Sequence, residues 1–285
     1  MLGIECRDGE RWLQDASGRR LVRLRRFAEV AGSMLGDVFI IASGPSTRRF
    51  PLYDYRRYPC LAMNGSILAC AEHGIAPLFY LCDDQSFVRD RGALALQGLA
   101  LASHVAMSLE VLSRLHEMDS GCLDGKSVFL LERVNRFVGQ PRLSDRAYAW
   151  SIRKNKELVT SFSWIRRAPN RIGFSLNLDK GYFVARTIPY VALQLSHQLG
   201  GRRVFLLGVD LTPASGRFYE VGDNAVLSSL DEDYGKYILP SFQLMAQRVV
   251  EPGRFEVFNL SGDSRMPEQV IPKLSLRALE ALLSA

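Results

Sequence analysis

The chain has 285 residues, of which 47% are hydrophobic, and its formal net charge is +6. This length and composition suit one large domain or two small ones. No apolar run approaches the ~18 residues of a membrane-spanning helix, and charged residues stand where a secretory signal would place its apolar segment. The five cysteines lack the paired spacing of metal ligands, and several lie in apolar surroundings. We therefore expect reduced thiols in a cytoplasmic protein.

Residues 1–36 are predicted to form a basic N-terminal helical segment. In the run RRLVRLRRF at residues 19–27, a helix would place Leu21, Leu24 and Phe27 on one side. Two roles fit this run: a solvated helix that covers the domain, or a patch that touches anionic lipid or glycolipid phosphate at the inner membrane. No nucleic-acid-binding motif is present, so nucleic acid is not expected as a partner.

A short apolar run at residues 38–43 predicts a buried strand that ends at the turn-forming sequence Gly44-Pro45-Ser46. In a nucleotide-binding α/β domain such a turn faces the ligand. A glycine lets a ligand approach the backbone, so free N–H groups and the Ser46 hydroxyl are expected to face phosphate or ribose. The sequence is neither a Walker loop nor the dinucleotide-binding Gly-x-Gly-x-x-Gly motif.

Two further strands are predicted at residues 59–63 and 77–82, with a helix at residues 67–73 between them. The first strand ends at Asn64-Gly65-Ser66 and the second at Asp83-Asp84. Ligands of open parallel sheets bind at the carboxyl ends of the strands, so these polar residues should meet near Gly44. The alternatives are an ordinary turn at Asn64 and a helix cap at the two aspartates.

The following segments alternate between helix and strand. A helix is predicted around residues 91–101, and strands at residues 104–107 and 127–131. Residues 132–178 are rich in Arg, Asn, Ser and aromatic residues but poorly patterned, which is typical of a lid or of an insertion with short helices.

Regular patterns return after this insertion. We expect helices at 184–199, 241–250 and 275–284, and strands at 204–207 and 255–260. This alternation predicts an α/β fold: a mainly parallel Rossmann-like sheet with helices on both faces, formed as a single domain by residues 37–285.

Three segments of the chain resemble one group of proteins. They are IIASGPS at residues 40–46, RTIPYVALQLSHQLGGRRVFLLGVD at residues 186–210, and VFNLSGDS at residues 257–264. In this order they resemble bacterial sialyltransferases and Kdo-transferase-like proteins that use CMP-sugars. They also resemble the related MptE-like proteins and the motility-associated flagellin glycosylation proteins.

The resemblance implies a nucleotide-sugar transferase in which the loop at residues 44–46 holds CMP and Asn64 binds its phosphate or ribose. It also implies that Asp83 and Thr187 line the nucleotide pocket and that Tyr219 contacts the leaving phosphate. With Ser66 of the adjacent turn, the predicted donor-binding residues are Gly44, Pro45, Ser46, Asn64, Ser66, Asp83, Thr187 and Tyr219.

The chain departs from the sialyltransferases in two places. Ile188-Pro189 stand where their Thr is followed by Ser-Gly, and Lys236-Tyr237 stand where their catalytic His precedes a Tyr. A relative that uses CMP-Kdo or another CMP-ulosonate, as in lipopolysaccharide core assembly, therefore fits better than a sialyltransferase. The acceptor is then a lipopolysaccharide or another surface glycan.

Transfer from a CMP-ulosonate requires charge stabilisation at the leaving phosphate and a base for the acceptor hydroxyl. Asp84 and Glu220 are the first candidates for the base, and Asp210 is the third; Asp210 also suits a structural role in which it accepts backbone N–H groups of a loop. Arg186 or Arg217 can add positive charge. No metal or cofactor besides the donor is expected.

Two other functions stay open from the sequence. An MptE-like pyrophosphokinase would use ATP and hold Mg²⁺ with Asp83, Asp84 and Asp210. A relative that has lost its base would bind a nucleotide or glycan without catalysis.

Overall fold

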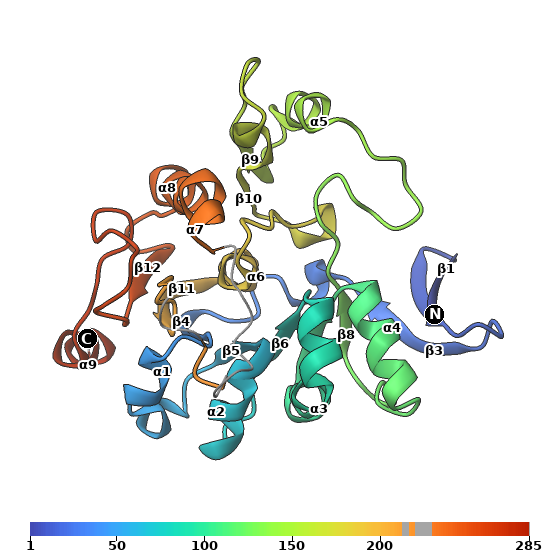
Figure 1. Cartoon of the computed structure of the whole chain (residues 1–285), viewed down its shortest axis with the longest axis horizontal. Coiled ribbons are helices and arrows are strands. Elements are labelled where there is room, and N and C mark those ends of the chain that lie inside the picture. The colour runs from blue at the N-terminus through green and yellow to red at the C-terminus, as the bar shows by residue number, and fades with distance from the viewer. Residues whose placement is uncertain (213–216, 220–229, 285) are drawn as a thin grey trace.

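The computed structural model describes residues 1–212, 217–219 and 230–284. Within these residues, ten strands form one sheet in the order β1-β2-β3-β8-β7-β6-β5-β4-β11-β12, and β9 pairs with β10 separately (Figure 1). The strands are β1 Gly3–Arg7, β2 Glu10–Gln14, β3 Arg20–Arg25, β4 Gly36–Ile41, β5 Cys60–Met63, β6 Phe79–Cys82, β7 His104–Met107, β8 Val128–Leu130, β9 Leu158–Thr160, β10 Gly173–Ser175, β11 Gly201–Leu207 and β12 Glu256–Asn259. The α-helices are α1 Ser46–Arg49, α2 Ile67–Glu72, α3 Gln85–Leu101, α4 Leu109–Met118, α5 Asp145–Ile152, α6 Ile188–Leu199, α7 Leu230–Asp233, α8 Leu239–Arg248 and α9 Leu276–Leu283.

The sheet is parallel from β3 to β12 and antiparallel only between β1, β2 and β3. The predicted α/β fold with a mainly parallel sheet is therefore confirmed. The buried strands are nearly all apolar because helices cover both of their faces. Each predicted strand between residues 38 and 131, and those at 204–207 and 255–260, corresponds to a strand of the sheet.

Alternate residues of β4 point into two separate cores. Val38 and Ile40 pack in the core that includes residues of α6 and α8, whereas Phe39 and Ile41 pack in the core that includes residues of α2, α3 and α4. This follows from the two-residue period of a strand. The predicted arrangement with helices on both faces is confirmed (Figure 1).

The predicted N-terminal helix is wrong. Residues 1–25 form the antiparallel strands β1, β2 and β3, and β3 continues into the main sheet by pairing with β8. Leu13 and Leu24 are buried while the intervening positions are half-buried or exposed, so the same apolar residues serve a strand period instead of a helical one. The turn at Asp8-Gly9, where both residues have positive φ, closes the hairpin and favours this outcome.

The arginines of this strand are already paired with carboxylates. Arg20 bonds Glu5 with N···O distances of 2.6 and 2.8 Å, and both Arg23 and Arg25 reach Glu29. The hydrogen bond from the Arg26 backbone N–H makes the largest contribution to lowering the pKa of Glu29. With the side-chain hydrogen bonds from Arg25 and Arg23, it lowers this pKa to about 2. The basic run is thus largely neutralised by acidic residues beside it.

Several boundaries differ from the predictions. Helix α4 was not predicted, and α3 begins at Gln85 instead of near Arg91, where a non-helical residue kinks it. Helix α6 begins at Ile188 because the two residues before Thr187 have positive φ. Among the described residues, no helix is long and apolar enough to span a bilayer.

The insertion predicted at 132–178 contains α5 and the β9–β10 hairpin, which project from the sheet at the top of the view in Figure 1. Gln194 of α6 connects this segment to the body of the protein. Its side-chain oxygen accepts the backbone N–H groups of Ser175 and Phe183 at 2.9 and 3.0 Å, and its amide nitrogen donates to the carbonyls of Phe183 and Tyr190. This fully buried amide is satisfied only when residues 175–183 lie against α6.

We therefore expect Gln194→Leu to lower the free energy of unfolding by about 2–4 kcal/mol, because it leaves buried N–H and C=O groups without partners. Urea denaturation followed by circular dichroism measures the change. The exposed Gln243→Leu of α8 is the matched control and should change the unfolding midpoint little. Equal midpoints for the two variants would contradict this role of Gln194.

Candidate functional site

The loops that follow β4, β5, β6 and β11 lie at the carboxyl edge of the sheet, as predicted for a ligand site. Asp210, after β11, holds the loop after β4. One of its oxygens accepts the Ser46 backbone N–H at 3.0 Å and the other accepts the Ser46 hydroxyl at 2.5 Å. The predicted loop-holding role of Asp210 is confirmed, and its role as a base stays a prediction.

The space left by the missing side chain of Gly44 is filled by the protein, and contact of this residue with a ligand stays a prediction. A Cβ at this position would overlap the Asp210 carboxylate and the Gly208 carbonyl, so the missing side chain makes space for the protein itself. The N–H groups were also expected to be free, but Gly44 N–H donates to the Gly208 carbonyl at 2.9 Å and Ser46 N–H to Asp210. The loop is therefore a rigid wall of the site and not an open anion cradle.

Asn64 occupies the end of β5 with an unusual backbone. Its φ is +45°, a left-handed conformation that asparagine tolerates better than most residues. Its side-chain oxygen is buried, and it has no hydrogen-bond partner among the described residues. A buried acceptor in this state is stabilised by a donor from a ligand. Ser66, in contrast, is buried and its hydroxyl accepts the Met63 N–H, so it faces the interior.

Tyr219 is half-buried and packs on the turn that contains Asn64. A Cβ at Gly65 would overlap the Tyr219 ring, and the ring meets Phe87 edge-to-face at 6.0 Å. The structure therefore brings Tyr219 beside Asn64, as the predicted site requires. Thr187 is half-buried at the start of α6 and makes no capping hydrogen bond. The predicted base Glu220 lies outside the described residues.

The two adjacent aspartates after β6 have different surroundings. Asp84 caps α3: one of its oxygens accepts the Phe87 N–H at 3.1 Å and the Ser86 hydroxyl at 2.5 Å. The predicted alternative of a helix cap is thus confirmed for this residue. Among the described residues, nothing donates a hydrogen bond to its second oxygen, and the side chain is half-buried.

Asp83 connects the sheet edge to the insertion. Its Oδ2 accepts two hydrogen bonds from the Arg133 guanidinium, at 2.7 and 2.9 Å, and one from the Tyr182 hydroxyl. The Tyr182 backbone in turn pairs with residues 132 and 134, so the three side chains are held from two chain segments. Burial is the main reason that the pKa of the Tyr182 hydroxyl lies well above its ordinary value.

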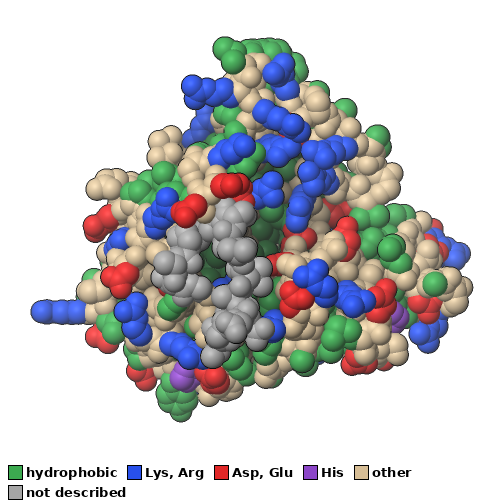
Figure 2. Space-filling model, in the orientation of Figure 1, with side chains coloured by type: hydrophobic (Ala, Val, Ile, Leu, Met, Phe, Trp, Pro, Cys, Tyr) green, Lys and Arg blue, Asp and Glu red, His purple; other side chains and the backbone are tan. Residues whose placement is uncertain are grey.

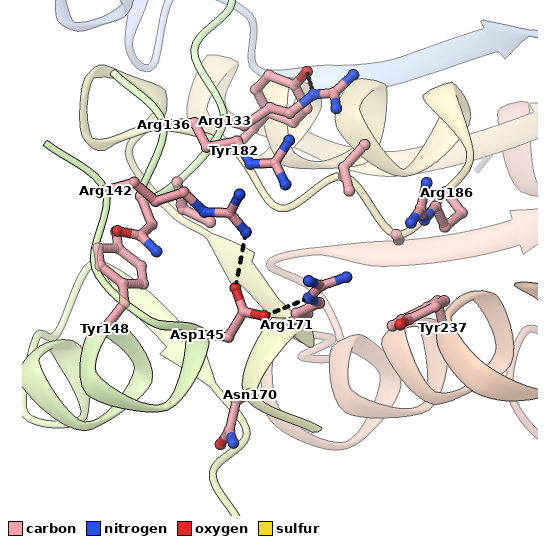
Figure 3. A pocket seen from close by; sticks show the side chains of 14 residues that line it. Arg133, Arg136, Arg142, Asp145, Tyr148, Asn170, Arg171, Tyr182, Arg186 and Tyr237 are labelled. Atoms are coloured by element: carbon pink, nitrogen blue, oxygen red, sulfur yellow. Dashed lines mark hydrogen bonds and ion pairs between the residues drawn. The ribbon is translucent and has the colours of Figure 1, made fainter. Parts of the chain in front are cut away.

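Beyond this link, an arginine pocket opens between the insertion, the start of α6 and the π-helix at Tyr234–Ile238 (Figure 3). Figure 2 shows Lys and Arg side chains gathered on this face. Asp145 is the carboxylate among the lining residues, and it pairs with Arg142 at 3.3 Å and Arg171 at 2.7 Å. The charged and aromatic lining consists of Arg133, Arg136, Arg142, Asp145, Tyr148, Arg171, Tyr182, Arg186 and Tyr237.

Sequence reasoning missed this pocket. Its arginines are spread over more than fifty residues with no helical or strand period, and only folding brings them together. The arginine-rich composition of residues 132–178 was the available signal. Arg186 and the Lys236-Tyr237 pair had been noted from the sequence, and the pocket includes Arg186 and Tyr237. Ala185 and Arg186 both have positive φ, a strained pair of the kind found at binding sites.

Comparison with known proteins agrees with this geometry. The family model described as "3-deoxy-D-manno-octulosonic acid transferase WaaZ" matches residues 28–277. A "Probable 3-deoxy-manno-octulosonic acid transferase" of Escherichia coli strain K12 is 27% identical over 250 residues, covering 86% of this chain and 84% of the relative. A protein of the same description from Salmonella typhimurium strain LT2 is 28% identical over 244 residues, covering 86% and 88%.

One solved structure is also similar. The chain matches the MAf glycosyltransferase from Magnetospirillum magneticum AMB-1 with a TM-score of 0.47 and 17% identity. The match covers 87% of this chain but 35% of that glycosyltransferase, so the chain spans about a third of its length. Nothing about the site is transferred from this similarity.

The hold of Asp210 on Ser46 is testable by a double-mutant cycle with Asp210→Ala and Ser46→Ala. We expect a coupling energy of about 1–2 kcal/mol in the free energy of unfolding, because both substitutions remove the bond from the Ser46 hydroxyl to the Asp210 carboxylate, whereas only Asp210→Ala also removes the bond from the Ser46 backbone N–H. The exposed Asp263→Ala provides the control with no coupling to Ser46. If the effects of the two substitutions on the free energy of unfolding were strictly additive, the bond between the Ser46 hydroxyl and Asp210 would contribute nothing to stability.

Proposed function

The chain belongs to the WaaZ family of 3-deoxy-D-manno-octulosonic acid (Kdo) transferases, and we propose that its donor, CMP-Kdo, binds across the carboxyl edge of the sheet. It is a glycosyltransferase that transfers Kdo to an acceptor in the lipopolysaccharide core. In the reaction the acceptor oxygen bonds to the anomeric carbon of Kdo, the bond from that carbon to the phosphate oxygen breaks, and CMP leaves. The acceptor hydroxyl loses its proton to a base.

The observation that carries the donor site is the buried side-chain oxygen of Asn64, which has no hydrogen-bond partner in the described part of the chain. A ribose hydroxyl or the cytosine amino group supplies the donor that this oxygen lacks. The Tyr219 ring packs against the same turn, which places this residue where the predicted contact with the leaving phosphate requires it. Gly44, Pro45 and Ser46 then form the wall that positions the nucleotide, held by Asp210.

The base is proposed among the predicted carboxylates. Asp84 retains one oxygen that accepts no hydrogen bond from a described residue, while its other oxygen fixes the side chain at the helix start. Glu220 remains the second candidate. Asp210 ranks third because both of its oxygens already accept hydrogen bonds from Ser46.

The two alternative functions receive less support. Asp83 is bound to Arg133 and Tyr182, Asp84 caps α3, and Asp210 holds Ser46. A pyrophosphokinase would need these carboxylates for Mg²⁺, and all three accept hydrogen bonds from within the protein. A non-catalytic relative predicts donor binding without turnover. Peripheral contact with the inner membrane and a cytoplasmic location stay predictions. The membrane contact is motivated by the acceptor, because lipopolysaccharide is lipid-anchored.

The donor site is tested by removing the Asn64 amide. Asn64→Gly keeps the left-handed backbone accessible and should weaken CMP binding about tenfold, because a buried hydrogen bond is lost. Isothermal titration calorimetry measures the affinity. Asp8→Gly, at another position with positive φ but remote from the site, is the matched control. Unchanged CMP affinity in Asn64→Gly would place the nucleotide elsewhere.

The base is tested with Asp84→Asn and Glu220→Gln. Asparagine caps helices as well as aspartate does, so Asp84→Asn removes the base and keeps α3. We expect one of the two variants to lower kcat by about a hundredfold or more and to bind CMP normally. Asp119→Asn, which also alters a carboxylate that accepts a backbone N–H, controls for the amide substitution. Wild-type turnover in both variants would exclude both residues.

Metal independence is a further expectation. CMP is a good leaving group, so transfer should continue in excess EDTA. The measurement is the rate of CMP release with EDTA and after Mg²⁺ is added back. Loss of activity that Mg²⁺ restores would favour the pyrophosphokinase alternative.

A further inference from the structure

We propose that the arginine pocket binds an anionic group, a carboxylate or a phosphate, of the acceptor saccharide. This inference rests on the proposed Kdo-transferase function and assigns one of its substrates to a place. The lining contributes five guanidinium groups and one carboxylate, that of Asp145. An arginine fork matches carboxylate and phosphate oxygens in a bidentate geometry.

The protein leaves part of this positive charge uncompensated. Arg142 and Arg171 share Asp145, and Arg133 is bound to Asp83. Arg136 forms no ion pair with any carboxylate among the described residues. Burial, followed by the charges of Arg142, Arg133 and Arg171, lowers the pKa of Arg136. Its surroundings thus disfavour its charge, and an anion bound beside it would relieve that repulsion.

The order of the strands assigns the pocket to the acceptor and not to the donor. The donor loop follows β4 and Asn64 follows β5, whereas Arg133 lies just after β8, four strands from β4. At about 4.8 Å between strands, this separation is about 19 Å. The carboxylate of a ulosonate donor is bonded to the anomeric carbon and stays beside the leaving phosphate. It therefore stays at the donor edge, near β4 and β5, whereas the pocket arginines of the insertion enter from beyond Asp83 at the end of β6.

Apolar and aromatic groups complete a surface that suits a saccharide. Val134, Val184 and Tyr237 line the pocket. The Arg186 guanidinium lies over the Tyr237 ring, 5.5 Å from the ring centre. Asp83, bound to both Arg133 and Tyr182, lies between the pocket and the donor edge. An acceptor held by its anionic group in the pocket can thus extend a hydroxyl toward the donor.

The test compares Arg136→Gln, Arg136→Lys and the control Arg202→Gln in steady-state kinetics. Arg202 is also exposed and has no ion pair among the described residues, but it lies at the amino end of β11, away from the site. We expect Arg136→Gln to raise the KM for the acceptor about tenfold and to leave the KM for CMP-Kdo unchanged. Arg136→Lys should recover part of the loss.

The source of the anion is identified by two altered acceptors, one with its carboxylates reduced and one with its phosphates removed. One of these two alterations should abolish the difference in acceptor KM between wild type and Arg136→Gln. The group removed by that alteration is the one that the pocket binds. A rise in the KM for CMP-Kdo alone, or no change in either KM, would overturn the assignment. Calorimetric titration of the acceptor in the absence of donor tests the pocket separately, so a wild type that fails to transfer Kdo counts against the proposed function only.

An independent observation concerns the outer end of the insertion, an aromatic tip formed by Trp150, Phe162, Trp164 and Ile165. The three rings lie 4.8–5.3 Å apart, yet Trp164 is 60% exposed and Ile165 is 91% exposed. Arg153 stacks on Trp150 with its guanidinium 3.5 Å from the ring centre. Figure 2 shows hydrophobic and basic side chains together at this end of the molecule.

Most basic side chains near the aromatic tip have no carboxylate partner among the described residues, unlike those of β3; Arg167, which pairs with Asp145, is an exception. Five exposed basic side chains there have no carboxylate partner among the described residues: Arg146, Arg153, Lys154, Lys156 and Arg166. Exposed tryptophan surrounded by uncompensated cations is the combination that binds the interface of an anionic bilayer. We infer that the aromatic tip, and not the arginine run at residues 19–26, contacts the membrane.

Vesicle cosedimentation tests this inference without any activity measurement. The probes are phosphatidylcholine vesicles with and without phosphatidylglycerol. The double variant Trp164→Ser with Ile165→Ser should lower binding to anionic vesicles about tenfold, and salt should weaken wild-type binding. Leu35→Ser, at another side chain that is 87% exposed, is the matched control. Replacing Arg19, Arg20, Arg23, Arg25 and Arg26 with Gln should change binding little.

Two results would overturn the membrane assignment. One is unchanged vesicle binding by the double variant at the tip. The other is a dimer in sedimentation velocity that disappears in the double variant, which would make the aromatic tip an interface between two copies of the chain.

Discussion

The buried amide of Gln194 is the constraint on which the site depends. Three of its four hydrogen bonds join α6, which packs on the sheet, to residues 175–183 at the end of the insertion, and the fourth goes to Tyr190 within α6. In a buried environment each of these polar groups is costly without its partner, so the two chain segments are fixed in one arrangement. Tyr182 lies in that segment, and through it the insertion meets the carboxyl edge of the sheet.

At that edge, Asp83 joins the two halves of the site. It accepts hydrogen bonds from Arg133, at the beginning of the insertion, and from Tyr182, at its end. A carboxylate in this position ties the Arg133 guanidinium to the sheet edge. Asp83 thereby connects the carboxyl edge of the sheet with the segment from which the arginine pocket is built.

The pattern of buried strands was sufficient to predict the sheet, because a run such as residues 38–41 is apolar on both sides and ends at turn residues. Strand β3 was predicted as part of a helix, because Leu21, Leu24 and Phe27 fit a helical face as well as a strand. Pairing with β8, more than a hundred residues away, decides for the strand. Local sequence does not contain that contact.

The sequence by itself determined the α/β class, the polar residues that follow the strands at the carboxyl edge, and the transferase family, because each of these depends on short contiguous motifs. Only the tertiary structure decided how those residues are used. Gly44 makes room for Asp210, and the arginines of the pocket converge from three separate segments. Arginines that follow no helical or strand period do not reveal from the local sequence that they share one site. Their common pocket forms only when the chain folds.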